Sequence, residues 1–180
     1  MRFLHTYRTD QSGLTDQVEV RQVKLYTGAD AGQRRRKKPK GKPNYGTWHR
    51  GHLVAAEFGA AMELINLAWM ARATNQGRSA ARASGDGNQE VASLIDRFSN
   101  PGSLFGGSLD EKGEWKVPAY RAVERGVREL ASLAASRSES ISIQVTLERN
   151  PPSDRMFYRV WVVSPSGRSL AEFRCVVAHF

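Results

Sequence analysis

The sequence predicts an α+β domain, with strands at both ends of the chain and one long helix between them. Two runs of alternating apolar residues open the chain, and three longer runs close it. Between them, residues 118–136 carry apolar residues at three- and four-residue spacing, which is typical of an amphipathic helix. With 180 residues and no internal repeat, the chain is expected to form a single domain over residues 1–180.

The first 26 residues predict a β-hairpin. Phe3, His5 and Tyr7 alternate with other residues in the first run. In the second run the apolar parity changes between Val20 and Val23, which predicts a bulge or twist there. The sequence TDQSG between the runs supplies turn residues and a glycine.

The middle of the chain mixes short elements with loops. Residues 27–46 show no apolar periodicity and contain proline and glycine, so they are expected to form a loop. The run ELINLAWMA is strand-like, and the glycine-rich residues 78–89 predict a flexible insertion. EVASLIDRF (90–98) predicts a short helix, and residues 103–115 are expected to be loop again.

The last third of the chain carries the clearest patterns. The helix over 118–136 has one apolar face, made of Tyr120, Val123, Val127, Leu130 and Ala134. The strand after it alternates strictly, with Ile141, Ile143, Val145 and Leu147 on one side. Two more strands follow, over 156–163 and from residue 170 onward, separated by turn residues.

The chain is strongly basic. It has 27 Lys and Arg against 18 Asp and Glu, a formal net charge of +9. Such a charge favours polyanionic partners, which are nucleic acids or anionic membrane surfaces, although it also fits a protein that is merely soluble and basic. A membrane partner is not expected, because no run is long and apolar enough to span and the helix 118–136 carries charges of both signs.

Seven of the basic residues lie close together in the predicted loop 27–46. They are Arg34, Arg35, Arg36, Lys37, Lys38, Lys40 and Lys42. We expect this segment to act as an arm that neutralises phosphates, the alternatives being a solvated surface run or a localisation signal.

Cysteine and tryptophan usage restricts the other kinds of site. Cys175 is the only cysteine, so an intrachain disulfide and a thiolate zinc site are both excluded, and it is expected in the core. The tryptophans at 48, 69, 115 and 161 are also expected in the core rather than as platforms for base stacking.

One short stretch, TWHRGHLVAAEFG, carries candidate chemistry. An unperturbed histidine has a pKa near 6.5, so His52 is a suitable residue type for a base that removes a proton from water near neutral pH. Arg50 can hold a phosphate through two hydrogen bonds, and Gly51 leaves room for close approach. Asn66 and Asn75 follow, and an asparagine carbonyl is a suitable oxygen ligand for Mg²⁺.

These motifs together resemble the DNA/RNA non-specific endonucleases, which are ββα-metal (His-Me finger) nucleases. The resemblance rests on RGHLVAAEFG, on INLAWM and on an asparagine nine residues after the first one. It extends to YRTDQSG, to the helix AYRAVERGVRELA and to ISIQVTLERNPPSDRMF. It therefore covers most of the chain, and it is strongest to the branch found as toxin domains of bacterial secreted proteins. The resemblance implies a ββα-metal core with an antiparallel sheet and flanking helices.

The resemblance also implies a role for each matching residue. His52 matches the general base that activates water, and Arg50 matches the arginine near the phosphate. Asn75 matches the ligand of Mg²⁺, or of another divalent ion such as Mn²⁺. Asn66 matches the asparagine that supports the geometry of the site, and Glu124 matches the helical glutamate that orients metal-bound water.

This chain departs from the family pattern in three places. His49 stands where the family has an aspartate, and Ala68-Trp69 replaces a proline-containing pair. The interval from Asn75 to Glu124 is long, which predicts an insertion over 78–117 and leaves Glu90 as a competitor of Glu124.

The expected function is a metal-dependent endonuclease that hydrolyses phosphodiester bonds of DNA, RNA or both. The resemblance further implies a toxin or effector that is secreted or injected into a target cell, with an immunity protein as cognate partner. No signal-peptide core is visible at the start of the sequence. The alternative is a non-catalytic nucleic-acid-binding protein with a decayed site. This alternative stays open because His49 stands where the family has an aspartate.

Overall fold

The computed structural model describes most of the chain outside its middle third. The described residues are 5–25, 48–60, 64–72, 98, 101–117, 119–135, 137, 139–149 and 155–177. Their elements, in chain order, are β1 (His5–Thr9), β2 (Thr15–Val20), β3 (Trp48–His52), η2 (Ala56–Phe58), η3 (Leu64–Asn66), β4 (Leu67–Ala71), α3 (Pro101–Phe105), β5 (Ser108–Leu109), β6 (Trp115–Val117), α4 (Tyr120–Ala135), β7 (Ser140–Glu148), β8 (Arg155–Val163) and β9 (Ser169–Val177).

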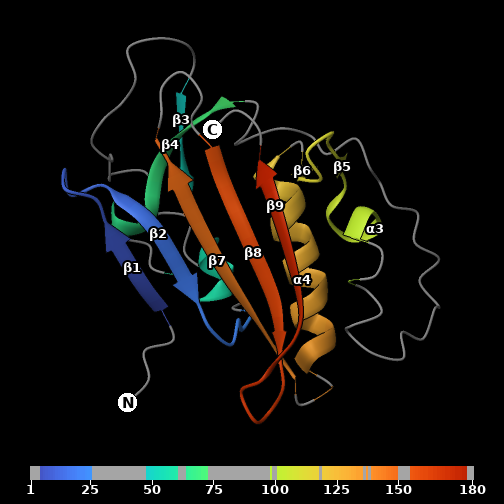
Figure 1. The fold of residues 1–180 in the computed structure, drawn as a ribbon. Helices are drawn as coiled ribbons and strands as arrows, with labels where there is room; N and C mark the ends of the chain where they lie inside the picture. The colour runs from blue at the N-terminus through green and yellow to red at the C-terminus, as the bar shows by residue number, and fades with distance from the viewer. Residues whose placement is uncertain are drawn as a thin grey trace.

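A seven-stranded sheet forms the body of the molecule (Figure 1). Its strand order is β1-β2-β7-β8-β9-β6-β5, and every neighbouring pair is antiparallel except β6 and β9. Strands β3 and β4 form a separate antiparallel hairpin. The sheet is therefore mixed, and the hairpin that carries the candidate motif is not part of it.

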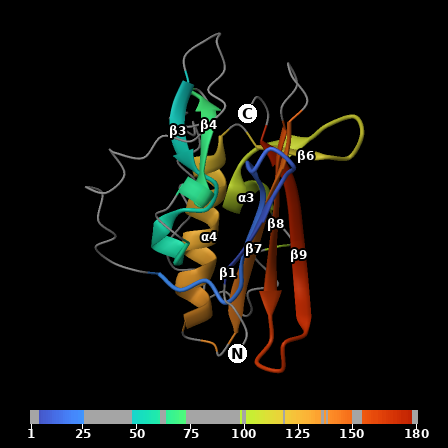
Figure 2. The same cartoon turned by 90° about the vertical axis from the view of Figure 1, so that its left-hand side faces the viewer.

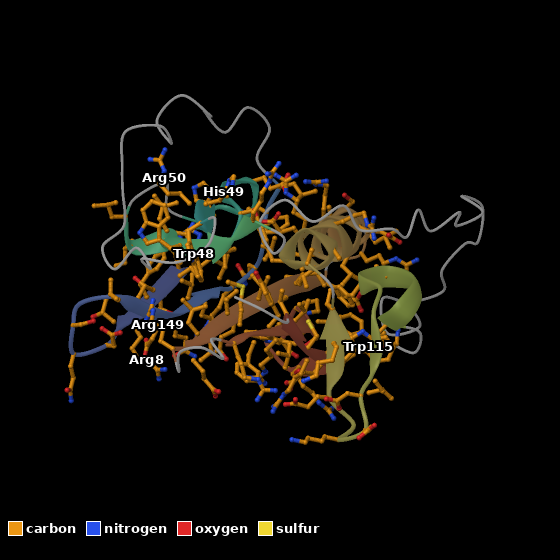
Figure 3. All side chains as sticks on the ribbon, turned by 90° about the horizontal axis from the view of Figure 1, so that it is seen from above. Arg8, Trp48, His49, Arg50, Trp115 and Arg149 are labelled. Carbon is orange, nitrogen blue, oxygen red and sulfur yellow. The ribbon has the colours of Figure 1, made fainter. Side chains whose placement is uncertain are left out.

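The two sides of the large sheet are covered differently. Helix α4 and the β3–β4 hairpin both lie on one side, which we call the inner face (Figures 2 and 3). Side chains alternate along a strand, and the inner residues of β8 are buried: Met156, Tyr158, Val160 and Val162. The residues between them are half-buried and point to the opposite side, which we call the outer face. No described helix lies over the outer face (Figure 2).

The predicted fold class is wrong. The described residues are 47% strand and 25% helix, so this part of the molecule is mostly β. Its one long helix, α4, packs against β7 and β6 of the large sheet and does not complete a ββα unit with the hairpin. A ββα-metal core with flanking helices is thus replaced by a mixed sheet with one long helix among the described elements. The strand-like run ELINLAWMA corresponds to η3 and β4, but its pairing with β3 and the order of the other strands depend on contacts between segments distant in sequence.

The strongly patterned elements are confirmed. The opening hairpin is present, and the helix predicted over 118–136 is α4, with its whole predicted apolar face buried. The three strands at the end of the sequence are β7, β8 and β9. The parity change after Val20 coincides with the end of β2. Gln22 adopts a positive φ of 53° there, and the N–H of Val23 then donates to the carbonyl oxygen of Ile141.

Residues 101–117 differ from the predicted loop. They form α3 and the β5–β6 hairpin, and β6 joins the large sheet beside β9. Phe105 is fully buried and its ring stacks on Phe173, with 4.4 Å between the centroids. In the turn of the hairpin, the carboxylate of Asp110 accepts backbone hydrogen bonds from Lys112 and Glu114. Buried contacts with residues distant in sequence stabilise this segment. Because such contacts leave no periodic pattern in the sequence, the segment resembles a loop.

The single cysteine and the tryptophans give opposite outcomes. Cys175 is buried as expected, and burial raises the pKa of its thiol. All four tryptophans are only half-buried; Trp115 packs against the buried core, whereas Trp161 points to the outer face of the sheet.

Several predictions fall outside the described residues. These are the basic loop 27–46, the flexible segment 78–89 and the short helix over 90–98 apart from Phe98, which is helical. Among the residues that are described, no helix is long and apolar enough to cross a membrane.

Candidate functional site

The candidate site is built on strand β3. Arg50 and His52 are two residues apart, so they share one side of the hairpin with their Cα atoms about 7 Å apart. Figure 3 shows Arg50 extending away from the seven-stranded sheet. His49 points to the opposite side of the hairpin, where its cross-strand neighbour is the buried Met70. The strand thus brings together the predicted base and the predicted phosphate ligand, and it separates the two histidines.

Asn66 fixes the backbone that follows His52. It is fully buried, and its Nδ2 donates to the carbonyl oxygen of Val54 at 2.7 Å. Its Oδ1 accepts from the N–H of Val54 at 3.1 Å, and its own carbonyl accepts from the N–H of Leu53 at 2.9 Å. Three hydrogen bonds therefore tie Asn66 to the two residues after His52. Asn66 therefore holds the backbone of Leu53 and Val54 in place, and the role that the resemblance implied for it in catalysis stays a prediction.

The hairpin is also connected to the large sheet. Thr15 of β2 donates its hydroxyl to the carbonyl oxygen of Ile65 at 2.7 Å, one residue before Asn66. The hydroxyl of Tyr158 on β8 lies 3.5 Å from the carbonyl oxygen of Leu53. These contacts hold the ends of β3 and β4 over the inner face, so the position of His52 depends on the fold as a whole.

Helix α4 presents one side to the segment after His52. Arg128 forms a double hydrogen bond with the carboxylate of Glu57 in η2, at 2.5 and 3.1 Å, and this pairing raises the pKa of Arg128. Glu124 lies one helical turn earlier, on the same side of α4. Burial raises the pKa of Tyr158 well above its ordinary value, and the nearby Glu124 adds to the shift.

The position of Glu124 bears on the choice between the two glutamates. Its charge acts on Arg128, which pairs with Glu57, and on Tyr158, whose hydroxyl lies near Leu53. The competitor Glu90 lies outside the described residues. The choice between the two glutamates therefore stays a prediction.

The described part of the site does not by itself hold a metal ion. No three His, Cys, Asp or Glu side chains among the described residues form a group that could bind one. The predicted ligand Asn75 lies outside the described residues, as do the basic residues 34–42. The described residues therefore include the predicted base and the predicted phosphate ligand, and the predicted metal ligand lies outside them.

The sequence did not indicate Tyr158, Glu57 or Arg128 as part of this region. Tyr158 lies in a predicted strand, and nothing in its spacing connects it to Leu53. Glu57 lies within the motif stretch, but nothing in its spacing connects it to Arg128, which is 71 residues away. Only the packing of α4 beside the hairpin brings these residues together.

The comparisons with known proteins do not identify a family. No family model matches the sequence, and no curated protein and no solved structure matches it either. The resemblance to the DNA/RNA non-specific endonucleases thus remains a prediction that rests on the motif residues and their order.

Proposed function

We propose that this protein is a metal-dependent endonuclease that hydrolyses phosphodiester bonds of DNA, RNA or both with little sequence preference. The observation that carries the proposal is the pairing of Arg50 and His52 on one side of a hairpin whose next two residues are fixed by Asn66. A net charge of +9 supports a polyanionic substrate.

The chain's own residues have distinct roles in the proposed reaction. Arg50 binds the phosphate to be cleaved, and His52 takes a proton from the attacking water. The new bond forms between the water oxygen and phosphorus, while the bond to the 3′ oxygen breaks. The products are a 5′-phosphate and a 3′-hydroxyl. Asn66 keeps β3 and the following loop in register, so that the imidazole and the guanidinium stay on the same side.

A divalent ion, Mg²⁺ or Mn²⁺, is part of the proposal through Asn75. When bound, such an ion would supply positive charge beside the phosphate. Glu124 is proposed to orient water near this ion from α4. The basic residues 34–42 are proposed to hold the backbone of the nucleic acid on either side of the cleaved bond.

A digest tests the proposal directly. Supercoiled plasmid and a structured RNA are incubated with the protein in Mg²⁺, in Mn²⁺ and in EDTA. We expect cutting of at least one substrate with either ion and none in EDTA, and 5′-phosphate ends on the products. Cutting should weaken steeply as salt is raised, because the substrate is held through its phosphates. Absence of cutting under every metal condition rejects the proposal.

One observation favours the alternative function, a non-catalytic nucleic-acid-binding protein. The Nε2 atom of His52 is buried, whereas a general base must reach the proton it removes. A binding protein would retard both nucleic acids in a gel shift, equally with Mg²⁺ and with EDTA, without shortening them. The digest and the gel shift together separate the two functions.

The biological setting follows from the same resemblance. We propose an effector or toxin domain, secreted or injected, that acts on nucleic acid in a target cell. Its producer would then need an immunity protein, and the charge of +9 favours an acidic one. Co-expression that restores growth of a producing strain would identify such a partner.

A further inference from the structure

The outer face of the sheet combines aromatic and arginine side chains. On β8, Phe157, Arg159 and Trp161 all point to this side, with successive residues about 7 Å apart. The guanidinium carbon of Arg159 lies 4.7 Å from the centre of the Trp161 ring. That of Arg155 lies 5.1 Å from the centre of the Phe157 ring. The strand thus presents two stacked pairs of an arginine and an aromatic ring.

A second arginine lies beside this row on β9. Arg159 and Arg174 are direct cross-strand neighbours, and both donate to the carboxylate of Glu172. Two guanidinium groups share one carboxylate, so this triad keeps one net positive charge. Arg174 bonds through its Nε, and its side chain is 73% exposed. Its terminal amino groups therefore keep hydrogen-bond donors for an anion in solution.

A cavity of about 500 Å³ lies over these residues. Its floor is formed by outward-facing side chains of β7, β8 and β9, including Gln144, Phe157, Arg159 and Arg174. Its wall is the turn between β5 and β6, with Glu114 at the rim. This turn projects beyond the outer face, past the labelled Trp115 of β6 (Figure 3). The volume falls in the usual range for sites that bind a small organic group.

The wall is held in place by ion pairs across the sheet. The carboxylate of Glu114 accepts from Arg155 of β8 and from Lys116 of β6, both at 2.7 Å. The hydrogen bond from Lys116 has the largest effect on the pKa of Glu114, and together with that from Arg155 it lowers this pKa below its ordinary value. The turn is therefore tied to the strand that carries the stacked pairs, and the cavity keeps a defined shape.

We infer that the outer face binds single-stranded nucleic acid, with one nucleotide seated in this cavity. A base can stack on Phe157 or on an arginine plane, and the following phosphate can bind Arg174. A double helix does not fit this mode, because its bases are already stacked on one another. The surface lies on the opposite side of the large sheet from β3, the strand that ends at His52, and binding there does not require the proposed nuclease activity.

The test measures binding without cleavage. The full chain is titrated, in EDTA, into a labelled oligothymidylate and into the same strand paired with its complement, and fluorescence anisotropy is recorded. The variants are Phe157→Ala, Phe157→Leu, Arg174→Ala and the control Arg168→Ala. Arg168 is an exposed arginine in the turn between β8 and β9, away from the cavity lining, so the control makes the same change in net charge.

We expect Phe157→Ala and Arg174→Ala each to weaken single-strand binding about fivefold or more relative to the control. Duplex binding should fall equally in Arg174→Ala and Arg168→Ala. Thermal melts identify any variant that fails to fold. Phe157→Leu preserves the apolar contact while removing the ring, and Arg174 is too exposed to be needed for folding.

Two outcomes overturn the inference. One is single-strand binding that is the same in the outer-face variants and in the control. The other is a concentration-dependent dimer, measured by light scattering, that these variants disrupt while the oligonucleotide has no effect, which would assign the face to a second copy of the chain. Because no cleavage is measured, neither outcome affects the proposed nuclease function.

Discussion

The two faces of the large sheet hold their functional candidates in different ways. On the inner side, Asn66 is fully buried; its side chain bonds the backbone of Val54 and its carbonyl bonds the N–H of Leu53, so one buried residue holds the segment after His52. On the outer face, Arg159, Glu172 and Arg174 interact through partly exposed ion pairs. Buried hydrogen bonds are costly to lose, whereas exposed ion pairs contribute little to stability. Substitutions should therefore affect folding on the inner side and binding on the outer face.

The largest expected effect is on cleavage, from His52→Ala. Removing the general base should lower the rate of metal-dependent cutting about 10²- to 10⁴-fold, as measured in the plasmid digest. Nucleic-acid binding in EDTA should be nearly unchanged, because the arginines and the basic loop remain.

The matched control is His49→Ala, on the same strand but on the other side of the hairpin. We expect this variant to keep most of the activity. Equal loss in both variants, with melting temperatures that fall together, would mean that the strand needs histidines for folding. Full activity in His52→Ala would reject the mechanism.

The next effect is on stability, from Asn66→Ala. This change leaves the N–H and the carbonyl of Val54 without their partners in a place where Val54 is 1% exposed. Each unsatisfied buried group costs about 1 to 3 kcal/mol, so the free energy of unfolding should fall by about 2 to 5 kcal/mol in urea titrations. Thr15→Val removes a single hydrogen bond to the same region and should cost less than half as much. Equal losses of unfolding free energy in Asn66→Ala and Thr15→Val would show that Asn66 is not the main support of the segment after His52.

Gly126→Ala tests the packing of the inner face. A Cβ at this position of α4 would lie 2.5 Å from Phe105 and 2.9 Å from the carbonyl oxygen of Leu104. Phe105 cannot move away, because it is fully buried and stacked on Phe173. Overpacking costs about 1 to 3 kcal/mol, and better helix propensity returns about 1 kcal/mol, so we expect a net loss near 1 kcal/mol. Ser132→Ala, at an exposed position of α4, should show no loss, and a stabilised Gly126→Ala would contradict the packing.

Local patterns explain which parts of the fold could be predicted. Helix α4 and strands β7 and β8 each bury a periodic set of residues on one side, so periodicity located them. The segment 101–117 has no such period, and its stability comes from Phe105 on Phe173 and from the pairing of β6 with β9. Those contacts join residues far apart in sequence. The mixed sheet was missed for the same reason.

The candidate site shows the same limit. The sequence indicated Arg50 and His52 as candidates, but the strand that puts them on one side of the hairpin appears only in the structure. The support of the site was not readable, because Tyr158 and Arg128 reach it from β8 and α4. The sequence also placed Trp161 in the core, because a tryptophan in an alternating strand does not reveal which side of the sheet is covered.

The smallest expected effect lies on the outer face, from Glu172→Gln. Burial alone would raise the pKa of Glu172, but the hydrogen bonds from Arg159 and Arg174 outweigh it and lower that pKa below 4.5. A carboxyl group whose pKa is lower in the folded state stabilises the fold at pH values above its pKa in the unfolded chain. This stabilisation is lost as the pH falls through its pKa in the folded state. The loss should be about 1 kcal/mol or less at neutral pH and should shrink toward zero below pH of about 4.

Urea titrations of the parent and the variant across this pH range measure the difference, with Glu111→Gln in the exposed β5–β6 turn as the control. A difference that does not change with pH would mean that the charge of Glu172 is not what stabilises the triad. The same variant removes a negative charge beside Arg174, so it should strengthen binding of the single-stranded oligonucleotide while it weakens the fold. If the outer face is adapted to an anionic ligand, Glu172→Gln should lower the free energy of unfolding and raise the affinity for the oligonucleotide. An ion pair that served only stability would give the first effect without the second.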